Sequence, residues 1–152
     1  MANIIHRIGI KASPVAVYKA VSTIEGVAAW WTNATSGTSE VGKDIEVRFN
    51  TPEGKEVGMM KMRVETLDQD KLVKWKFVEG PVEWIGTEVV FKLQHEGDVT
   101  IVLFAHNNWK EEIEFMAHCS MKWATFLLSL RELIETGKGR PSPHDMKIDN
   151  WN

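Results

Sequence analysis

The stretch KEEIEFMAHCSMKWATFLLSLRELIETG, residues 110–137, decides how the chain folds. Its inward residues recur at alternating steps of three and four, which places them on one face of an α-helix. We therefore expect a long helix over residues 110–136, about 40 Å in length, that ends at Gly137. The residues of its buried face are Ile113, Met116, Ser120, Trp123, Leu127, Leu130 and Ile134, with Cys119, Phe126 and Leu133 widening it.

Five segments before this helix supply a surface on which it can pack. Apolar and polar residues alternate in the first four, and the fifth is apolar on both faces, as in a strand near the centre of a sheet. Short, turn-rich links between the segments indicate antiparallel neighbours. Together with a similar first segment, they predict a curved six-stranded antiparallel sheet. The segments are Ile4–Ile10, 45–49, 60–64, 73–77, 89–93 and 99–106.

Two short helices are expected between the first strand and the others. Ser13 and the following proline are a favourable start for a helix over Pro14–Ser22, and a second helix should cover Glu25–Trp31. Neighbouring helical residues diverge by about 100°. We therefore expect one ring of the Trp30–Trp31 pair to anchor in the core and the other to reach a cavity mouth or the polar loop after it.

The order of these elements indicates an α+β fold, in which the sheet curls around a long C-terminal helix. We expect a single domain over residues 1–152, with its core in residues 3–137 and an irregular tail over 138–152. The two short helices would seal one end of the space between the sheet and the long helix.

Composition and charge limit the kinds of molecule that the protein is expected to bind and the compartment in which it is expected to occur. The 152-residue chain has a net charge of −3 and no long cluster of Lys or Arg, which argues against a nucleic-acid partner. It has no signal-like start and no uninterrupted apolar run of about 18 residues, so we expect no membrane span and a cytoplasmic protein. The single cysteine, Cys119, fits a reducing compartment.

Two motifs resemble a known superfamily. The run IHRIGIKASPVAVYKAVSTIEGVAAWWT at residues 5–32, and the helix end ETGKGRPSP at residues 135–143, are similar to the START-like helix-grip (SRPBCC) superfamily. Within it, the chain resembles the small single-domain branch related to the activator-of-heat-shock-ATPase (AHSA-type) domain. The resemblance implies a deep, mostly apolar cavity between the curved sheet and the long helix, where members bind lipids, hormones or polyketides.

In such an architecture, large apolar side chains would face one interior volume, although plain core packing explains each of them equally well. The chain is rich in these groups, with seven Trp, six Phe and seven Met. The candidate ligand-binding residues inside the volume are Phe49, Met60, Met62, Trp75, Met116, Cys119, Ser120 and Trp123, and those near its mouth are Trp30, Trp31 and Trp84.

Catalytic and metal-binding motifs are absent from the sequence, and we expect neither a metal nor a cofactor. His106 is the weak catalytic candidate: it ends an apolar strand, so its ring could orient a carbonyl or hydroxyl group at the cavity rim. The alternative is a rim histidine that only satisfies its neighbours. Cys119 fits a small buried hydrophobe better than a nucleophile, because no base accompanies it in the sequence.

Three functions remain open from the sequence. The first is the binding of a hydrophobic or amphipathic small molecule, without catalysis. The second is a polyketide cyclase-like or hydrolase-like enzyme using His106, and the third is a co-chaperone-type regulator of a heat-shock ATPase. The resemblance implies that such activators engage the chaperone through a separate N-terminal domain, and we expect only one domain in this chain, which weighs against the third function. A homodimer is compatible with all three.

Overall fold

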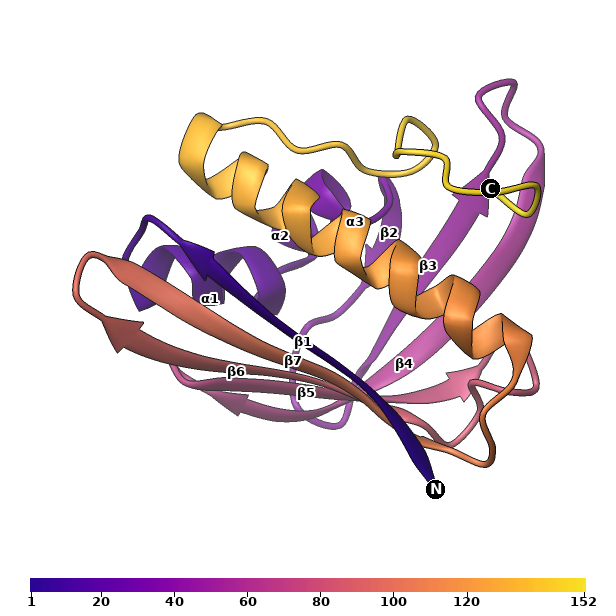
Figure 1. Ribbon diagram of the computed structural model, residues 1–152, viewed down its shortest axis with the longest axis horizontal. Helices are drawn as coiled ribbons and strands as arrows, with labels where there is room; N and C mark the ends of the chain where they lie inside the picture. Colours follow the sequence, from indigo (N-terminus) through magenta and orange to yellow (C-terminus); the bar gives the residue numbers. More distant parts are fainter.

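The curvature of one antiparallel sheet positions the other elements of the molecule (Figure 1). The computed structural model describes residues 1–152. The long helix lies across the concave face of the sheet, and the two short helices lie at one end. The elements are β1 (Ala2–Ile10), α1 (Pro14–Ser22), α2 (Ile24–Trp30), β2 (Ala34–Gly37), β3 (Asp44–Asn50), β4 (Glu56–Asp68), β5 (Leu72–Glu79), β6 (Glu88–Glu96), β7 (Val99–Trp109) and α3 (Glu114–Thr136).

The sheet has seven strands in the order β1-β7-β6-β5-β4-β3-β2, so the prediction of six strands was wrong by one. The additional strand is β2, inside the segment expected to be a polar loop, and it pairs only with β3. Its residues, ATSG, are small and polar, so they give no alternating apolar signal. The strand forms at the sheet edge through backbone pairing, such as that of Thr35 with Val47.

The long helix is confirmed, but it begins later than predicted. β7 continues to Trp109, and α3 starts at Glu114 rather than at Lys110. Gly137 ends the helix as expected: its φ of 90° is left-handed, and its N–H donates to the Leu133 carbonyl at 2.8 Å. No helix in the structure has the length and apolar character needed to cross a membrane.

The short helices begin at the expected capping residues. Ser13 Oγ accepts from the backbone N–H of Ala16 at 3.4 Å, and α1 has the predicted bounds. Thr23 Oγ1 accepts from the N–H of Gly26 at 3.0 Å, and α2 begins one residue earlier than expected. Both contacts satisfy N–H groups that a helix leaves without intrahelical partners.

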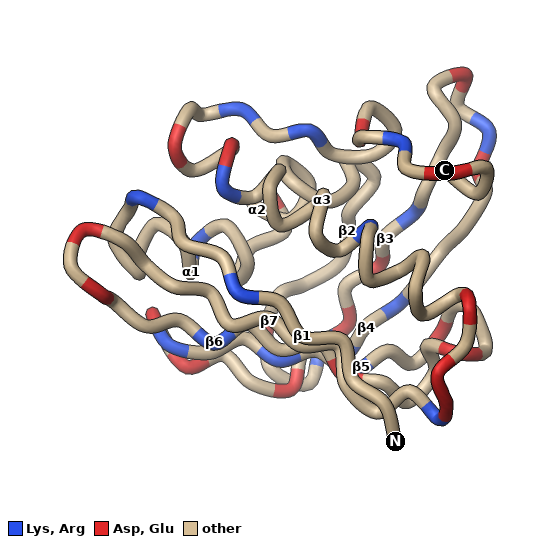
Figure 2. Tube along the Cα trace, in the orientation of Figure 1, with Lys and Arg blue, Asp and Glu red and all other residues tan.

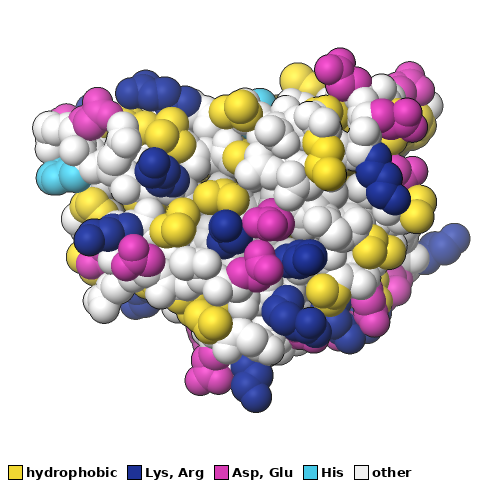
Figure 3. All heavy atoms as spheres, turned by 90° about the horizontal axis from the view of Figure 1, so that it is seen from below, with side chains coloured by type: hydrophobic (Ala, Val, Ile, Leu, Met, Phe, Trp, Pro, Cys, Tyr) yellow, Lys and Arg dark blue, Asp and Glu magenta, His cyan; other side chains and the backbone are white.

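Charged side chains cover the outer surface of the sheet. Acidic and basic residues are interspersed along the chain (Figure 2), and the face in Figure 3 mixes the two signs with scattered apolar groups. Some of these charges pair across neighbouring strands, as Lys61 does with Glu79 at 3.4 Å and Lys74 with Glu88 at 3.5 Å. This pattern is typical of an antiparallel sheet with one face in solvent.

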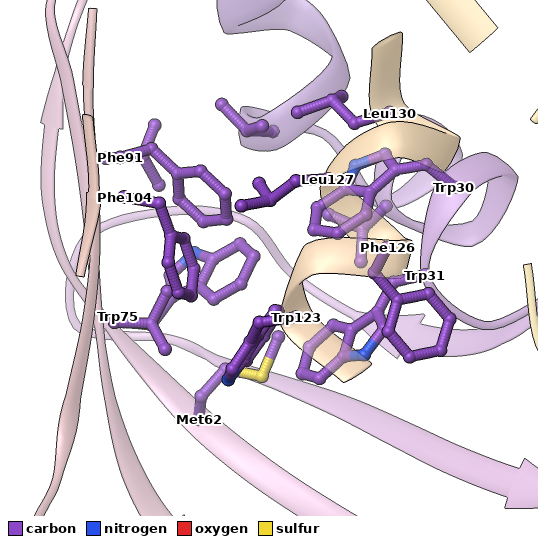
Figure 4. Close-up of a cluster of buried hydrophobic side chains, with 14 of the residues drawn as sticks. Trp30, Trp31, Met62, Trp75, Phe91, Phe104, Trp123, Phe126, Leu127 and Leu130 are labelled. Atoms are coloured by element: carbon purple, nitrogen blue, oxygen red, sulfur yellow. The ribbon is translucent and has the colours of Figure 1, made fainter. Parts of the chain in front are cut away.

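Aromatic rings fill most of the space between the sheet and α3 (Figure 4). Trp31 stacks on Trp75 with ring centroids 6.0 Å apart, and its centroid lies 5.0 Å from that of Trp123. Trp30 contacts Phe91 edge-on at 5.9 Å. The interior volume implied by the family resemblance is therefore mostly packed, and the remaining void lies toward one end.

Trp30 joins several elements through hydrogen bonds. Its side chain is fully buried, and Nε1–H donates to the Ala20 carbonyl at 2.9 Å. The backbone carbonyl of Trp30 accepts from Ser129 Oγ at 2.9 Å, and the same hydroxyl oxygen accepts from the N–H of Arg140 at 2.7 Å. Trp30 is thus the core anchor of the tryptophan pair, linking α2 to α1, α3 and the start of the tail.

Gly26 lies within α2, where glycine is about 1 kcal/mol less favourable than alanine. A Cβ at this position would lie 2.5 Å from the carbonyl oxygen of Ala20 and 2.7 Å from its Cα. The missing side chain lets α2 approach the end of α1, where the Trp30 indole reaches the same carbonyl. Close packing therefore explains a residue that helix propensity does not favour.

We predict that Gly26→Ala lowers the free energy of unfolding by about 2 kcal/mol, because backbone overlap outweighs the gain in helix propensity. Urea unfolding followed by circular dichroism measures this change. The matched control is Gly58→Ala, which adds a Cβ where no atom lies within 4 Å. An unchanged or higher unfolding midpoint for Gly26→Ala would contradict the packing explanation.

Candidate functional site

A pocket of about 230 Å³ lies between α3, the strands β3 and β4, and the end of the tail. Ten of its fourteen lining residues are hydrophobic, and α3 contributes the largest share of the wall. The lining residues are Trp31, Phe49, Val57, Gly58, Met60, Trp84, Phe115, His118, Cys119, Lys122, Trp123, Phe126, Trp151 and Asn152.

Half of the sequence-predicted site residues line this pocket. They are Trp31, Phe49, Met60, Trp84, Cys119 and Trp123. Of the tryptophan pair, Trp31 therefore faces the pocket, while Trp30 is the core anchor. Trp31 is also fully buried by its neighbours, so it forms an inner wall of the pocket rather than a group at its mouth.

The other six predicted residues lie elsewhere. Trp30, Met62, Trp75 and His106 are buried in the packed core and do not line the pocket. Met116 and Ser120 lie beside β1, and the Ser120 carbonyl oxygen is 3.0 Å from His6 Nε2. The buried face of the helix predicted from the sequence is broad. Residues on one side of it, such as Cys119 and Trp123, line the pocket, whereas Met116 and Ser120 on the other side lie beside β1.

Polar residues of α3 near the pocket were missed by sequence reasoning. His118 and Lys122 are four residues apart, one helical turn, and both line the pocket. A single charged residue within the otherwise uncharged run CSMKWATF was the available signal for Lys122. The other missed lining residues are Val57, Gly58, Phe115, Phe126, Trp151 and Asn152.

Lys122 holds the tail against α3. Its Nζ donates to Asp145 Oδ2 at 2.5 Å, to the Met146 carbonyl at 2.7 Å and to Asn152 Oδ1 at 3.1 Å. Burial raises the pKa of Asp145, but the hydrogen bond and the charge of Lys122 outweigh that effect and hold it below its ordinary value. The ammonium group therefore has a complete set of three acceptors, all from the tail.

His118 makes a second contact with the tail. Its Nδ1 lies 2.8 Å from Asp149 Oδ2, and this hydrogen bond lowers the pKa of the Asp149 carboxyl. Trp151 packs edge-on against the His118 ring, with centroids 5.4 Å apart. Through these contacts the tail docks on the helix face that borders the pocket.

His106 is fully buried, so the expectation of a position at the cavity rim was wrong. The hydroxyl of Thr87 donates to the Trp84 carbonyl at 2.6 Å, so its oxygen accepts from His106 Nε2–H at 2.8 Å. Trp123 Nε1–H donates to His106 Nδ1 at 3.1 Å. These partners define the Nε2–H tautomer and use both ring nitrogens.

Burial fixes the charge state of two groups near the site. It lowers the pKa of His106 to about 3 and raises the pKa of the Cys119 thiol to about 12. Both side chains are therefore neutral near pH 7. No three His, Cys, Asp or Glu side chains lie close enough together to hold a metal ion.

Three buried indole nitrogens lack a hydrogen-bond acceptor, those of Trp75, Trp84 and Trp109. Among them only Trp84 belongs to the pocket wall, and its side chain is 5% exposed. A buried donor without an acceptor costs about 1–3 kcal/mol. An oxygen atom placed beside Trp84 Nε1 would remove that cost.

The chain belongs to the family described as activator of Hsp90 ATPase homolog 1-like proteins, whose sequence pattern it matches over residues 11–135. A solved relative, the Aha1 dimer from Colwellia psychrerythraea, is 46% identical, with a TM-score of 0.82. The match covers 91% of this chain and all of that one (100%). None of the curated proteins compared with the sequence matches it.

More distant solved structures share the fold. Protein SSP2350 from Staphylococcus saprophyticus is 16% identical with a TM-score of 0.72, over 91% of this chain and 95% of that one. CalU16 from Micromonospora echinospora is 19% identical with a TM-score of 0.71, over 93% and 77% respectively. At these identities the likeness concerns architecture alone.

We predict that the buried neutral His106 makes the protein less stable in mild acid. The unfolded chain binds a proton at this residue below pH 6.5, whereas the folded chain does so only near pH 3. Stability contributed by this group is complete above pH 6.5 and falls by about 1.4 kcal/mol per pH unit below it.

The variant His106→Gln, measured by urea unfolding, isolates this effect. The variant should be less stable at pH 7, and its deficit relative to the parent should shrink by about 2 kcal/mol as the pH falls from 6.5 to about 5. The control His95→Gln changes an exposed histidine and should keep a constant difference. A constant difference for His106→Gln would show that this ring does not control acid stability.

Proposed function

We propose that the protein binds a small apolar or amphipathic molecule in the pocket beside α3. The observation that carries this proposal is the composition of the wall, where ten of fourteen lining residues are hydrophobic. Aromatic groups from four parts of the chain, Trp31, Phe49, Trp84 and Trp123, meet there. Small-molecule sites are typically apolar concavities with few polar groups.

The indole N–H of Trp84 has no oxygen or nitrogen acceptor in the protein, which favours a ligand that carries a polar atom. Apart from the Cys119 sulfur, which is a weak acceptor, no protein group accepts from this N–H, so a ligand oxygen beside it would form a stronger hydrogen bond. We therefore expect a ligand with an apolar body and at least one hydrogen-bond acceptor, rather than a pure hydrocarbon.

The side-chain geometry does not favour a catalytic role for His106. The ring is outside the pocket wall, and both of its nitrogens already bond to Thr87 and Trp123. A general acid or base must reach the proton that it transfers. The protonated thiol of Cys119 likewise gives little support to a nucleophilic mechanism.

Filling the pocket should weaken ligand binding. Gly58 lines the pocket and has space around its Cβ position, so Gly58→Leu should reduce the affinity for octan-1-ol by at least about tenfold. Isothermal titration calorimetry gives the affinities. Lys61→Leu, on the outer face of the same strand, is the matched control and should bind like the parent. Parent protein that binds neither octan-1-ol nor octanoate would refute the proposal.

We also propose that the protein forms a homodimer through the exposed edge of β1. The Colwellia relative is described as a dimer. In this chain β1 is a nine-residue edge strand that pairs only with β7, and Ile5 on it is 72% exposed. A long apolar edge of this kind can pair with a second strand.

Light scattering after size exclusion tests the dimer. The parent should have twice the 17.3 kDa mass of the chain, and Ile5→Lys should shift it to the monomer. Val82→Lys, at another exposed apolar residue, should leave the dimer intact. A parent that is monomeric at 100 µM would rule out the dimer, and a dimeric Ile5→Lys would place the interface elsewhere.

A further inference from the structure

The tail contacts both basic side chains of α3 that line the pocket, His118 and Lys122. His118 meets Asp149 and Lys122 meets Asp145, so each group that could attract an anion already faces a tail carboxylate. Trp151 and Asn152 are themselves part of the pocket wall. A segment of the chain therefore occupies the place where the polar end of a bound molecule would lie.

The tail divides into a fixed part and a loosely held part. Backbone hydrogen bonds join it to the body as far as Ser142, whose N–H donates to the Trp31 carbonyl and whose carbonyl accepts from the N–H of Asn33. After Ser142, all backbone–backbone hydrogen bonds of the tail are internal to it. We call residues 143–152 the strap. It is held to the body mainly through His118 and Lys122.

The contacts of the strap with His118 and Lys122 differ in exposure, and the more exposed contact is the easier one to break. The Asp145 side chain is 2% exposed, whereas that of Asp149 is 36% exposed and Trp151 as a whole is 51% exposed. Exposed ion pairs are weak and compete with water and with other anions. The Asp149–Trp151 end of the strap is therefore the part that another anion can displace.

Pocket volume supports the same conclusion. The pocket holds about 230 Å³ with the strap in place, below the roughly 300–1,000 Å³ common for small-molecule sites. Since Trp151 and Asn152 form part of its wall, their departure would enlarge it and uncover His118.

We propose that residues 143–152 are an internal competitor for the pocket, and that the ligand is an amphipathic carboxylate whose anionic head replaces Asp149 at His118. The inference rests on the proposed binding function and adds the charge of the ligand and its coupling to the strap. The apolar body of the ligand contacts the aromatic wall, and its carboxylate accepts the hydrogen bond of His118. Ligand binding therefore weakens strap docking, and strap docking weakens ligand binding by the same free energy.

Octanoate and octan-1-ol are matched probes that differ in the head group. By isothermal titration calorimetry, octanoate should bind more tightly than octan-1-ol. Asp149→Asn weakens the internal competitor, so it should strengthen octanoate binding by about fivefold and leave octan-1-ol unchanged. Glu96→Gln, which removes one acidic charge from an exposed ion pair with Arg7, is the control and should change neither affinity.

Limited trypsin digestion followed by mass spectrometry reports strap release directly. Lys147 lies within the strap, so octanoate should accelerate cleavage after this residue, and octan-1-ol should leave the cleavage rate unchanged. Equal binding of the two probes, unaffected by Asp149→Asn, would overturn the internal competitor while leaving the binding function intact. Protection of Lys147 by octanoate would also overturn it, because the strap would then close over the ligand. Failure of both probes to bind would remove the binding function itself.

Discussion

The packing of Trp31 between the sheet and α3 is the contact on which the rest of the interior depends. Its ring stacks on Trp75 of β5 and lies against Trp123 of α3, so this side chain bridges the two layers. Aromatic pairs at such separations contribute packing energy beyond simple burial. On one side of this contact the rings fill the core, and on the other side the pocket remains. Trp31 is therefore both a bridge between the layers and a wall of the candidate site.

Polar groups inside this aromatic core form a chain of hydrogen bonds. Trp123 donates to His106, His106 donates to Thr87, and Thr87 donates to the carbonyl of Trp84. The chain of donors runs in one direction and connects two walls of the pocket, Trp84 and Trp123. Because hydrogen-bonded buried networks are rigid, this network holds the Trp123 ring and the backbone of Trp84 in place. The histidine thus acts on the pocket through the orientation of its walls.

The sequence predicted those parts of the fold that depend on local signals. The Ser13 cap, the Gly137 stop and the alternating strands all express local preferences, and the structure has each of them. β2 was missed because its polar residues form a strand only through pairing with β3. For the site, residue type and period indicated which side chains turn inward. They did not indicate which of those would pack, as Met62 and Trp75 do, and which would border a void, as Phe49 and Met60 do. That distinction depends on the distance between layers, and the contribution of Trp151 depends on the path of an irregular tail.

The two edges of the sheet differ in a way that limits how copies of the chain can associate. β1 offers nine residues with an exposed isoleucine, whereas β2 offers four small polar residues. Strand pairing between copies propagates into a fibre only when both edges of a sheet accept a neighbour. Here the polar edge is too short to continue a sheet, so the dimer proposed through β1 would be complete once two copies have met. β2, the shortest strand of the sheet and the one that the sequence pattern did not predict, would therefore prevent further copies from adding to such a dimer.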